Sequence, residues 1–154
     1  MLTIKYNTMY NFSSIQNVLE HIHQFKDEDY PKEILIKPSD NNTTMAWLNR
    51  IRKTKVKFKS NSIKLVDIVI YYPFHDTEQD KLNQWKEDSV NCFVYKFGRD
   101  NIMAATYHST TKPHIHFAVI PVVNNHLSWS YYTQRDTIRI PAWEYEYINE
   151  ILQV

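Results

Sequence analysis

Three closely spaced histidines carry the strongest chemical signal in the sequence. His108, His114 and His116 lie within nine residues, and the segment around them is typical of two strands joined by the short turn 109–113. Alternate side chains of a strand share a face, so His114 and His116 should point the same way about 7 Å apart. A hairpin would bring His108 back beside them. The pattern predicts a metal site built from three imidazoles, with coordination positions left open.

Another class of phosphate-handling protein that uses clustered histidines lacks a required residue here. A histidine-triad nucleotide hydrolase needs His-x-His-x-His, but position 118 is Ala118. The single glycine, Gly98, excludes glycine-rich phosphate-binding loops. Phosphate chemistry would therefore need side chains or a metal.

A basic segment is the second functional signal. No acidic residue occurs from 41 to 66, although the chain as a whole has a net charge of only +1. Lysines at 53, 55, 57 and 59 alternate with other residues, so as a strand they would present a line of charges suited to a nucleic-acid backbone. Trp47 and Phe58 are candidates for stacking on bases. The predicted DNA-binding residues are Arg50, Arg52, Lys53, Lys55, Lys57 and Lys59.

Hydrophobic periodicity predicts the elements that position these residues. Strands are expected at 2–6, 33–37, 63–72, 102–108, 114–122 and 127–132. Helices are expected from a cap at Ser13 or Ser14 to the acidic turn 27–29, at 44–51, from Thr77 to just before Gly98, and at 141–151. The mixture predicts an α+β fold with a central, largely antiparallel sheet flanked by helices.

Composition limits the class of protein. The 154 residues, 43% of them hydrophobic, suit one globular domain spanning 1–154. A lone cysteine, Cys92, permits neither an internal disulfide nor a cysteine-based zinc site. We find no secretory signal and no apolar run long enough to span a membrane. These features predict a reduced, cytoplasmic protein.

The histidine region as a whole resembles a known family. Phe97-Gly98, Asn101-Ile102, the strand ending in His108, Pro113-His114-Ile115-His116 and Pro121 follow one another in the order found in the Mob/Pre (MobV-type) plasmid mobilisation relaxases, a branch of the HUH endonucleases. The resemblance covers residues 67 to about 136. It implies an HUH-type domain that cuts single-stranded or hairpin DNA, with Mg²⁺ or Mn²⁺ bound by His108, His114 and His116.

The family chemistry implies a covalent step. A side chain attacks a phosphodiester, becomes linked to the 5′-phosphate and releases a 3′-OH. The family nucleophile is thought to be a histidine on the first helix, where His21 and His23 flank the apolar stripe; spacing favours His21. Tyr131 and Tyr132 are the tyrosine alternatives. Host replication or transfer proteins are expected as further partners of such a plasmid, phage or other mobile-element protein.

The chain departs from the family pattern in the turn between the histidine strands. The family turn carries an acidic metal ligand, whereas residues 109–112 are one residue shorter and contain no carboxylate. Water or a DNA phosphate would fill the remaining metal positions. Two alternatives stay open: a non-catalytic DNA-binding relic of a relaxase, and a metal-dependent phosphoesterase for small nucleotides, which would have a closed pocket and no use for the basic segment.

Overall fold

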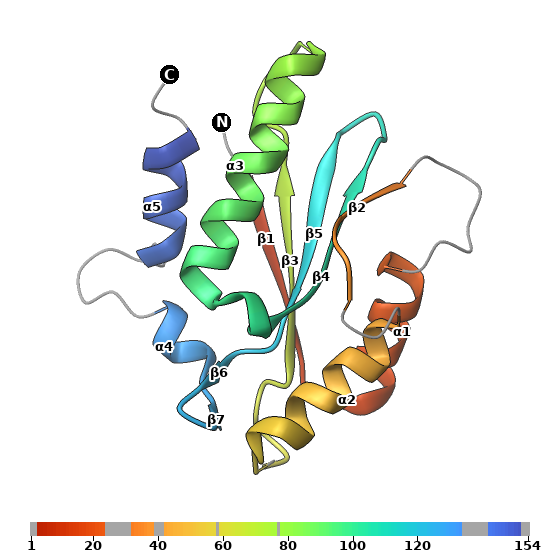
Figure 1. The fold of residues 1–154 in the computed structure, drawn as a ribbon, viewed down its shortest axis with the longest axis vertical. Coiled ribbons are helices and arrows are strands. Elements are labelled where there is room, and N and C mark those ends of the chain that lie inside the picture. Colours follow the sequence, from red (N-terminus) through yellow and green to blue (C-terminus); the bar gives the residue numbers. More distant parts are fainter. Residues whose placement is uncertain are drawn as a thin grey trace.

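The protein is built on a single five-stranded sheet in which every neighbouring pair is antiparallel. The computed structural model describes residues 3–23, 32–38, 42–57, 59–76, 78–133 and 142–151. The strand order is β1-β3-β5-β4-β2 (Figure 1). The strands are β1 (Ile4–Met9), β2 (Lys32–Ile36), β3 (Leu65–Tyr71), β4 (Ile102–His108) and β5 (His114–Val119).

Helices lie on both faces of this sheet. Figure 1 shows α3 and α5 on one side and α1 and α2 on the other. The helices are α1 (Phe12–His23), α2 (Thr43–Thr54), α3 (Gln79–Phe97), α4 (Trp129–Thr133) and α5 (Ala142–Ile151), with a 3₁₀ turn, η1 (Arg99–Asn101), before β4. A small hairpin of β6 (Val122–Val123) and β7 (His126–Leu127) follows the sheet. The predicted α+β fold is confirmed. Among the described helices, none is long and apolar enough to cross a membrane.

The two faces of the sheet are packed to different extents. On one face Ile68, Ile115 and Phe117 are fully buried, and Phe93 of α3 stacks on Phe117 with ring centroids 3.8 Å apart. On the other face, α1 and α2 contribute Ile15, Leu19, Ala46 and Trp47 to a second cluster, which also holds Leu65 and Ala118. Those sheet residues lie toward one end of β3 and β5. The opposite end of that face carries the histidines.

Two element predictions are wrong. The described residues between 53 and 59 do not form a strand, because α2 continues to Thr54 and ends at Lys55, whose φ is +53°. Arginine and lysine are strong helix formers and extend the helix beyond residue 51. Residues 127–132 are not one strand either, because Trp129 and Tyr132 share a face of α4 at helical spacing and both contact Phe97.

The starts and ends of the helices differ in detail from expectation. Asn11, rather than Ser13 or Ser14, caps α1, because its side-chain oxygen accepts a hydrogen bond from the Ser14 backbone N–H at 2.9 Å. Gly98 follows α3 with a φ of +82°, as its position after the helix predicted. The acidic turn 27–29, Phe58 and Thr77 lie outside the described residues.

Candidate metal centre

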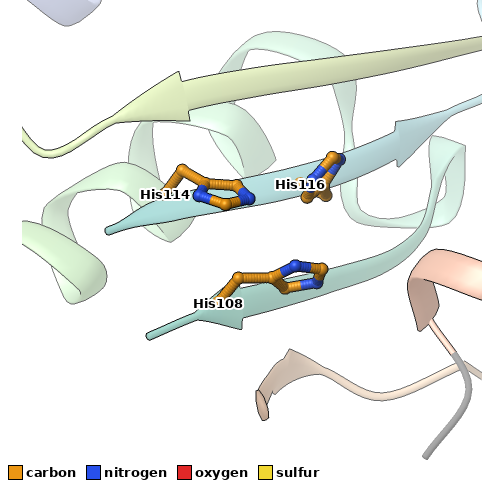
Figure 2. A group of neighbouring side chains, drawn as sticks. All are labelled: His108, His114 and His116. Atoms are coloured by element: carbon orange, nitrogen blue, oxygen red, sulfur yellow. The ribbon is translucent and has the colours of Figure 1, made fainter. Parts of the chain in front are cut away.

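The register of β4 and β5 brings the three histidines together on one face of the sheet. His108 pairs directly with His114, and Thr106 pairs with His116. One nitrogen from each histidine lies within 4.8 Å of the other two. Figure 2 shows the imidazoles gathered over the two strands. The predicted convergence of His108, His114 and His116 is therefore present in the structure.

Burial on the opposite face fixes this orientation. Ile115 and Phe117 alternate with the histidines and are fully buried against α3. Slipping the strand by one residue would put His114 and His116 into that core, so the register is strongly determined. His108 is itself buried, whereas His114 and His116 stay partly open to solvent. The site therefore has one enclosed and two accessible ligands.

Asp67 orients His116 and was not identified as a site residue from the sequence. His116 Nδ1 lies 3.0 Å and 3.1 Å from the two Asp67 carboxylate oxygens, and the Asp67 residue is only 2% exposed. Donation from Nδ1–H to the carboxylate leaves the Nε2 lone pair for a metal. The available signal was a carboxylate inside an otherwise apolar strand, since buried charges are seldom left without partners.

Backbone carbonyl groups orient the other two rings. His114 Nδ1 lies 2.8 Å from the Lys112 carbonyl oxygen, so Nδ1–H donates and Nε2 is available. His108 makes a hydrogen bond with the backbone of Ile22 in α1. The triad is thus supported by three separate segments: β3, the β4–β5 turn and the first helix.

The electrostatics of the site favour neutral imidazoles, the form that binds metal. Burial lowers the pKa of His108 to about 4, with smaller contributions from the neighbouring His116 and His114 rings. Burial also lowers the pKa of His114, and the hydrogen bond to Lys112 partly opposes this. Both ligands therefore stay unprotonated at neutral pH.

His23 lies beside the triad. Its residue is 5% exposed, its ring centroid is 6.4 Å from that of His116, and its Nδ1 lies 2.8 Å from Thr106 Oγ1. Its buried Nε2 has no hydrogen-bond partner among the described residues. Burial lowers the pKa of His23 to about 3, which keeps the ring neutral. The spacing Ile15, Leu19, His23 places it on the buried side of α1, a signal visible in the sequence.

The remaining predicted site residues have different outcomes. His21 belongs to α1, but its side chain lies outside the described set, so its role stays a prediction. Tyr132 hydrogen-bonds the Val122 carbonyl within the core of the opposite face, and burial raises the pKa of its phenol. Tyr131 is exposed on the same short helix, in contact with Tyr132. Neither tyrosine lies at the triad.

The basic segment lies at the other end of the sheet from the triad (Figure 1). Arg50 donates to Asn101 Oδ1 at 2.8 Å and is partly buried. Trp47 is buried and donates to the Lys64 carbonyl oxygen, so the expectation that it stacks on bases is wrong. The exposed cations are Arg52, Lys53, Lys55, Lys57 and Lys59.

Replacing Asp67 by asparagine should weaken metal binding about 10- to 100-fold, the usual effect of losing a charged partner of a ligand. Asparagine keeps the size of the side chain. It removes the negative charge that makes His116 Nε2 a stronger electron-pair donor to a metal. Titration calorimetry with Mn²⁺ measures the change, and Asp80→Asn, an exposed substitution on α3, is the matched control. Equal Mn²⁺ affinity in the two variants would contradict the role assigned to Asp67.

Comparison with known proteins identifies the family. A family model described as plasmid recombination enzyme, Mob_Pre, matches residues 37–140, which is more than half of the chain. No curated protein matches the chain.

Solved structures with the same fold are available. A manganese-bound crystal structure of the MobM relaxase domain, bound to 22 nucleotides of oriT DNA from plasmid pMV158, superposes with a TM-score of 0.71 at 17% identity, covering 98% of this chain and 83% of that one. The same domain bound to 26 nucleotides gives a TM-score of 0.67 at 18% identity, covering 98% and 82%. The fold is thus shared, and the family match extends through the triad and its strands: the chain belongs to the Mob_Pre family of plasmid recombination enzymes.

Proposed function

We propose that the protein is a metal-dependent endonuclease of single-stranded DNA that cuts by transesterification, as a relaxase or replication initiator of a plasmid, phage or other mobile element. The observation that carries this proposal is the convergence of His108, His114 and His116 on the partly open face of the sheet. Membership of the Mob_Pre family supports it. The single domain over 1–154, a cytoplasmic location and contacts with host proteins stay predictions.

The donor set suits a divalent transition metal. Imidazole nitrogen suits first-row ions, whereas Mg²⁺ prefers oxygen ligands and retains its water, so we expect Mn²⁺ to bind more tightly than Mg²⁺. A metal held by these three histidines would polarise the scissile phosphate and offset its developing charge. The absence of a carboxylate in the 109–112 turn leaves room for DNA phosphate oxygens at the metal.

We assign the nucleophile to His23, the alternative that the structure describes beside the triad. This role uses the tautomer in which Nδ1–H donates to Thr106 Oγ1, 2.8 Å away, and Nε2 carries the lone pair. Nε2 would attack phosphorus, so that an N–P bond forms and the P–O3′ bond breaks. The 3′ oxygen leaves and takes a proton from solvent, while the 5′-phosphate remains on the ring. The low pKa of His23 supports this role because a protonated imidazole cannot attack.

The basic segment would bind a separate part of the DNA. Its exposed cations, at 52–59, precede the start of β3 at Leu65, whereas Tyr71 at the far end of β3 pairs with His114. The two ends of β3 are six residue steps apart, or about 20 Å. A strand of several nucleotides can span that length, so DNA at the metal would extend along this side of the molecule to the lysines.

A strand-cleavage assay tests the proposal. The protein is incubated with labelled single-stranded oligonucleotides from its native origin region and Mn²⁺, and the products are separated on a denaturing gel. We expect one discrete product with a free 3′-OH, lost on chelation by EDTA. Binding without cleavage would favour the DNA-binding relic. Cleavage restricted to mononucleotide esters would favour the small-nucleotide phosphoesterase.

Charge reversal at Lys55 and Lys57 should weaken DNA binding and flatten its salt dependence. Each phosphate contact contributes about one unit to the slope of log K against log salt, so the slope should fall by about two. Fluorescence anisotropy from 50 to 300 mM salt measures it, with Lys96→Glu on α3 as the control. An unchanged slope would remove the basic segment from the DNA-binding surface.

A further inference from the structure

A pocket of about 450 Å³ opens next to the candidate metal centre. It lies where β1 begins, where β3 ends and where the β4–β5 turn returns, and its walls include Lys5, Tyr71, Phe74 and Lys112. Its volume lies within the range of about 300–1,000 Å³ typical of small-molecule sites. The size is sufficient for one nucleotide unit.

The pocket and the metal centre share a wall. Tyr71 pairs with His114 across β3 and β5, and their ring centroids are 5.4 Å apart. Lys112 lines the pocket, and its carbonyl oxygen accepts the hydrogen bond from His114 Nδ1. A group in the pocket therefore lies one aromatic ring away from a metal ligand. The pocket and the metal centre are therefore close enough to hold neighbouring nucleotides of one DNA strand.

The walls combine aromatic surface with positive charge. Tyr71 and Phe74 supply rings, and the Lys5 ammonium lies 5.4 Å from the centroid of the Tyr71 ring. Lys5 and Lys112 are both exposed, and no acidic residue lines the pocket among the described residues. The nearby Asp76 is paired with Lys81 at 3.0 Å. A ligand that combines a planar ring with an anionic group would complement these aromatic and cationic walls.

We propose that this pocket binds the nucleotide adjoining the scissile phosphate, with its base against Tyr71 and Phe74 and its other phosphate on Lys5 and Lys112. The assignment rests on the proposed nuclease function, whose site it extends. Stacking on aromatic rings tolerates every base, so the pocket holds the strand in place beside the metal centre without reading base identity. Its occupant is one nucleotide of a continuous strand.

Photocross-linking tests the assignment independently of cleavage. A 20-mer of thymidine with one 5-iododeoxyuridine is irradiated with the full chain, and the cross-linked peptide is identified by mass spectrometry. We expect cross-links within residues 71–75. Tyr71→Ala and Phe74→Ala should each weaken binding of the 20-mer about tenfold, whereas Tyr71→Phe keeps the ring and the affinity. Tyr95→Ala, at a residue 81% exposed on α3, should change nothing.

A Mn²⁺ titration separates this role from support of the metal site. Tyr71→Ala and Phe74→Ala should bind Mn²⁺ as tightly as the unchanged protein, because neither side chain is a ligand. Loss of Mn²⁺ binding together with DNA binding in both variants would contradict the pocket assignment, as would cross-links that map elsewhere on a chain that cleaves DNA. Cross-links at residues 71–75 that depend on Tyr71, on a chain that does not cleave, would uphold the pocket and overturn the proposed cleavage.

Discussion

Replacing His114 by alanine should abolish Mn²⁺-dependent cleavage and leave the chain folded. His114 supplies one of the three imidazoles that converge among the described residues, and loss of a group that merely orients a ligand already lowers metal affinity about 10- to 100-fold. We therefore expect a loss of Mn²⁺ affinity above about 100-fold, measured by titration calorimetry. The side chain is partly exposed and its Nδ1 bonds only the Lys112 carbonyl among the hydrogen bonds described, so its removal leaves no buried charge.

His116 is the less suitable position for this test. Its removal would leave the buried Asp67 carboxylate with only a 3.4 Å contact from Asn7 Nδ2 among the described side chains, which destabilises the fold. His126→Ala, an exposed histidine on β7, is the matched control for His114→Ala. Unchanged Mn²⁺ affinity in His114→Ala, with the same melting temperature, would show that the triad is not the metal site.

Substituting His23 by alanine should stop the covalent step while DNA still binds. Removal of a catalytic nucleophile lowers the chemical rate by a factor on the order of 10⁴–10⁶. Single-turnover cleavage at saturating protein measures this rate directly, and anisotropy with the same oligonucleotide measures binding. We expect the first to be lost and the second to change less than about threefold.

His21→Ala is the control for the nucleophile, because His21 was the residue that helix spacing favoured. If His23 is the nucleophile, His21→Ala cleaves at near the normal rate. The reverse pattern, with cleavage lost in His21→Ala and retained in His23→Ala, would move the nucleophile to His21. It would leave His23 as a buried partner of Thr106.

Local pattern predicted the triad because the residues involved are close in sequence. Alternation of His114, Ile115, His116 and Phe117 fixes one face of a strand, and the short turn fixes the partner that carries His108. The prediction needed no knowledge of the rest of the fold. The same reasoning placed α3 and its end at Gly98.

Contacts between distant segments were not predictable in this way. Asp67 and His116 are 49 positions apart and meet only because β3 pairs with β5. The alternating lysines fit the sequence pattern of a strand. However, α2, whose Ala46 and Trp47 are packed in the core, continues through Lys53 to Thr54. His23 continues the i, i+4 series from Ile15 through Leu19, and that series predicts its burial, which spacing from the N-terminus does not.

Identification of a covalent protein–DNA adduct tests the central claim most directly. The protein is incubated with labelled single-stranded origin DNA and Mn²⁺, resolved on a denaturing gel, digested and mapped by mass spectrometry. We expect a 5′-phosphate linked to His23 and no adduct after chelation of the metal. DNA that is bound under every condition without any adduct or cleavage would contradict it and leave a DNA-binding relic of a relaxase.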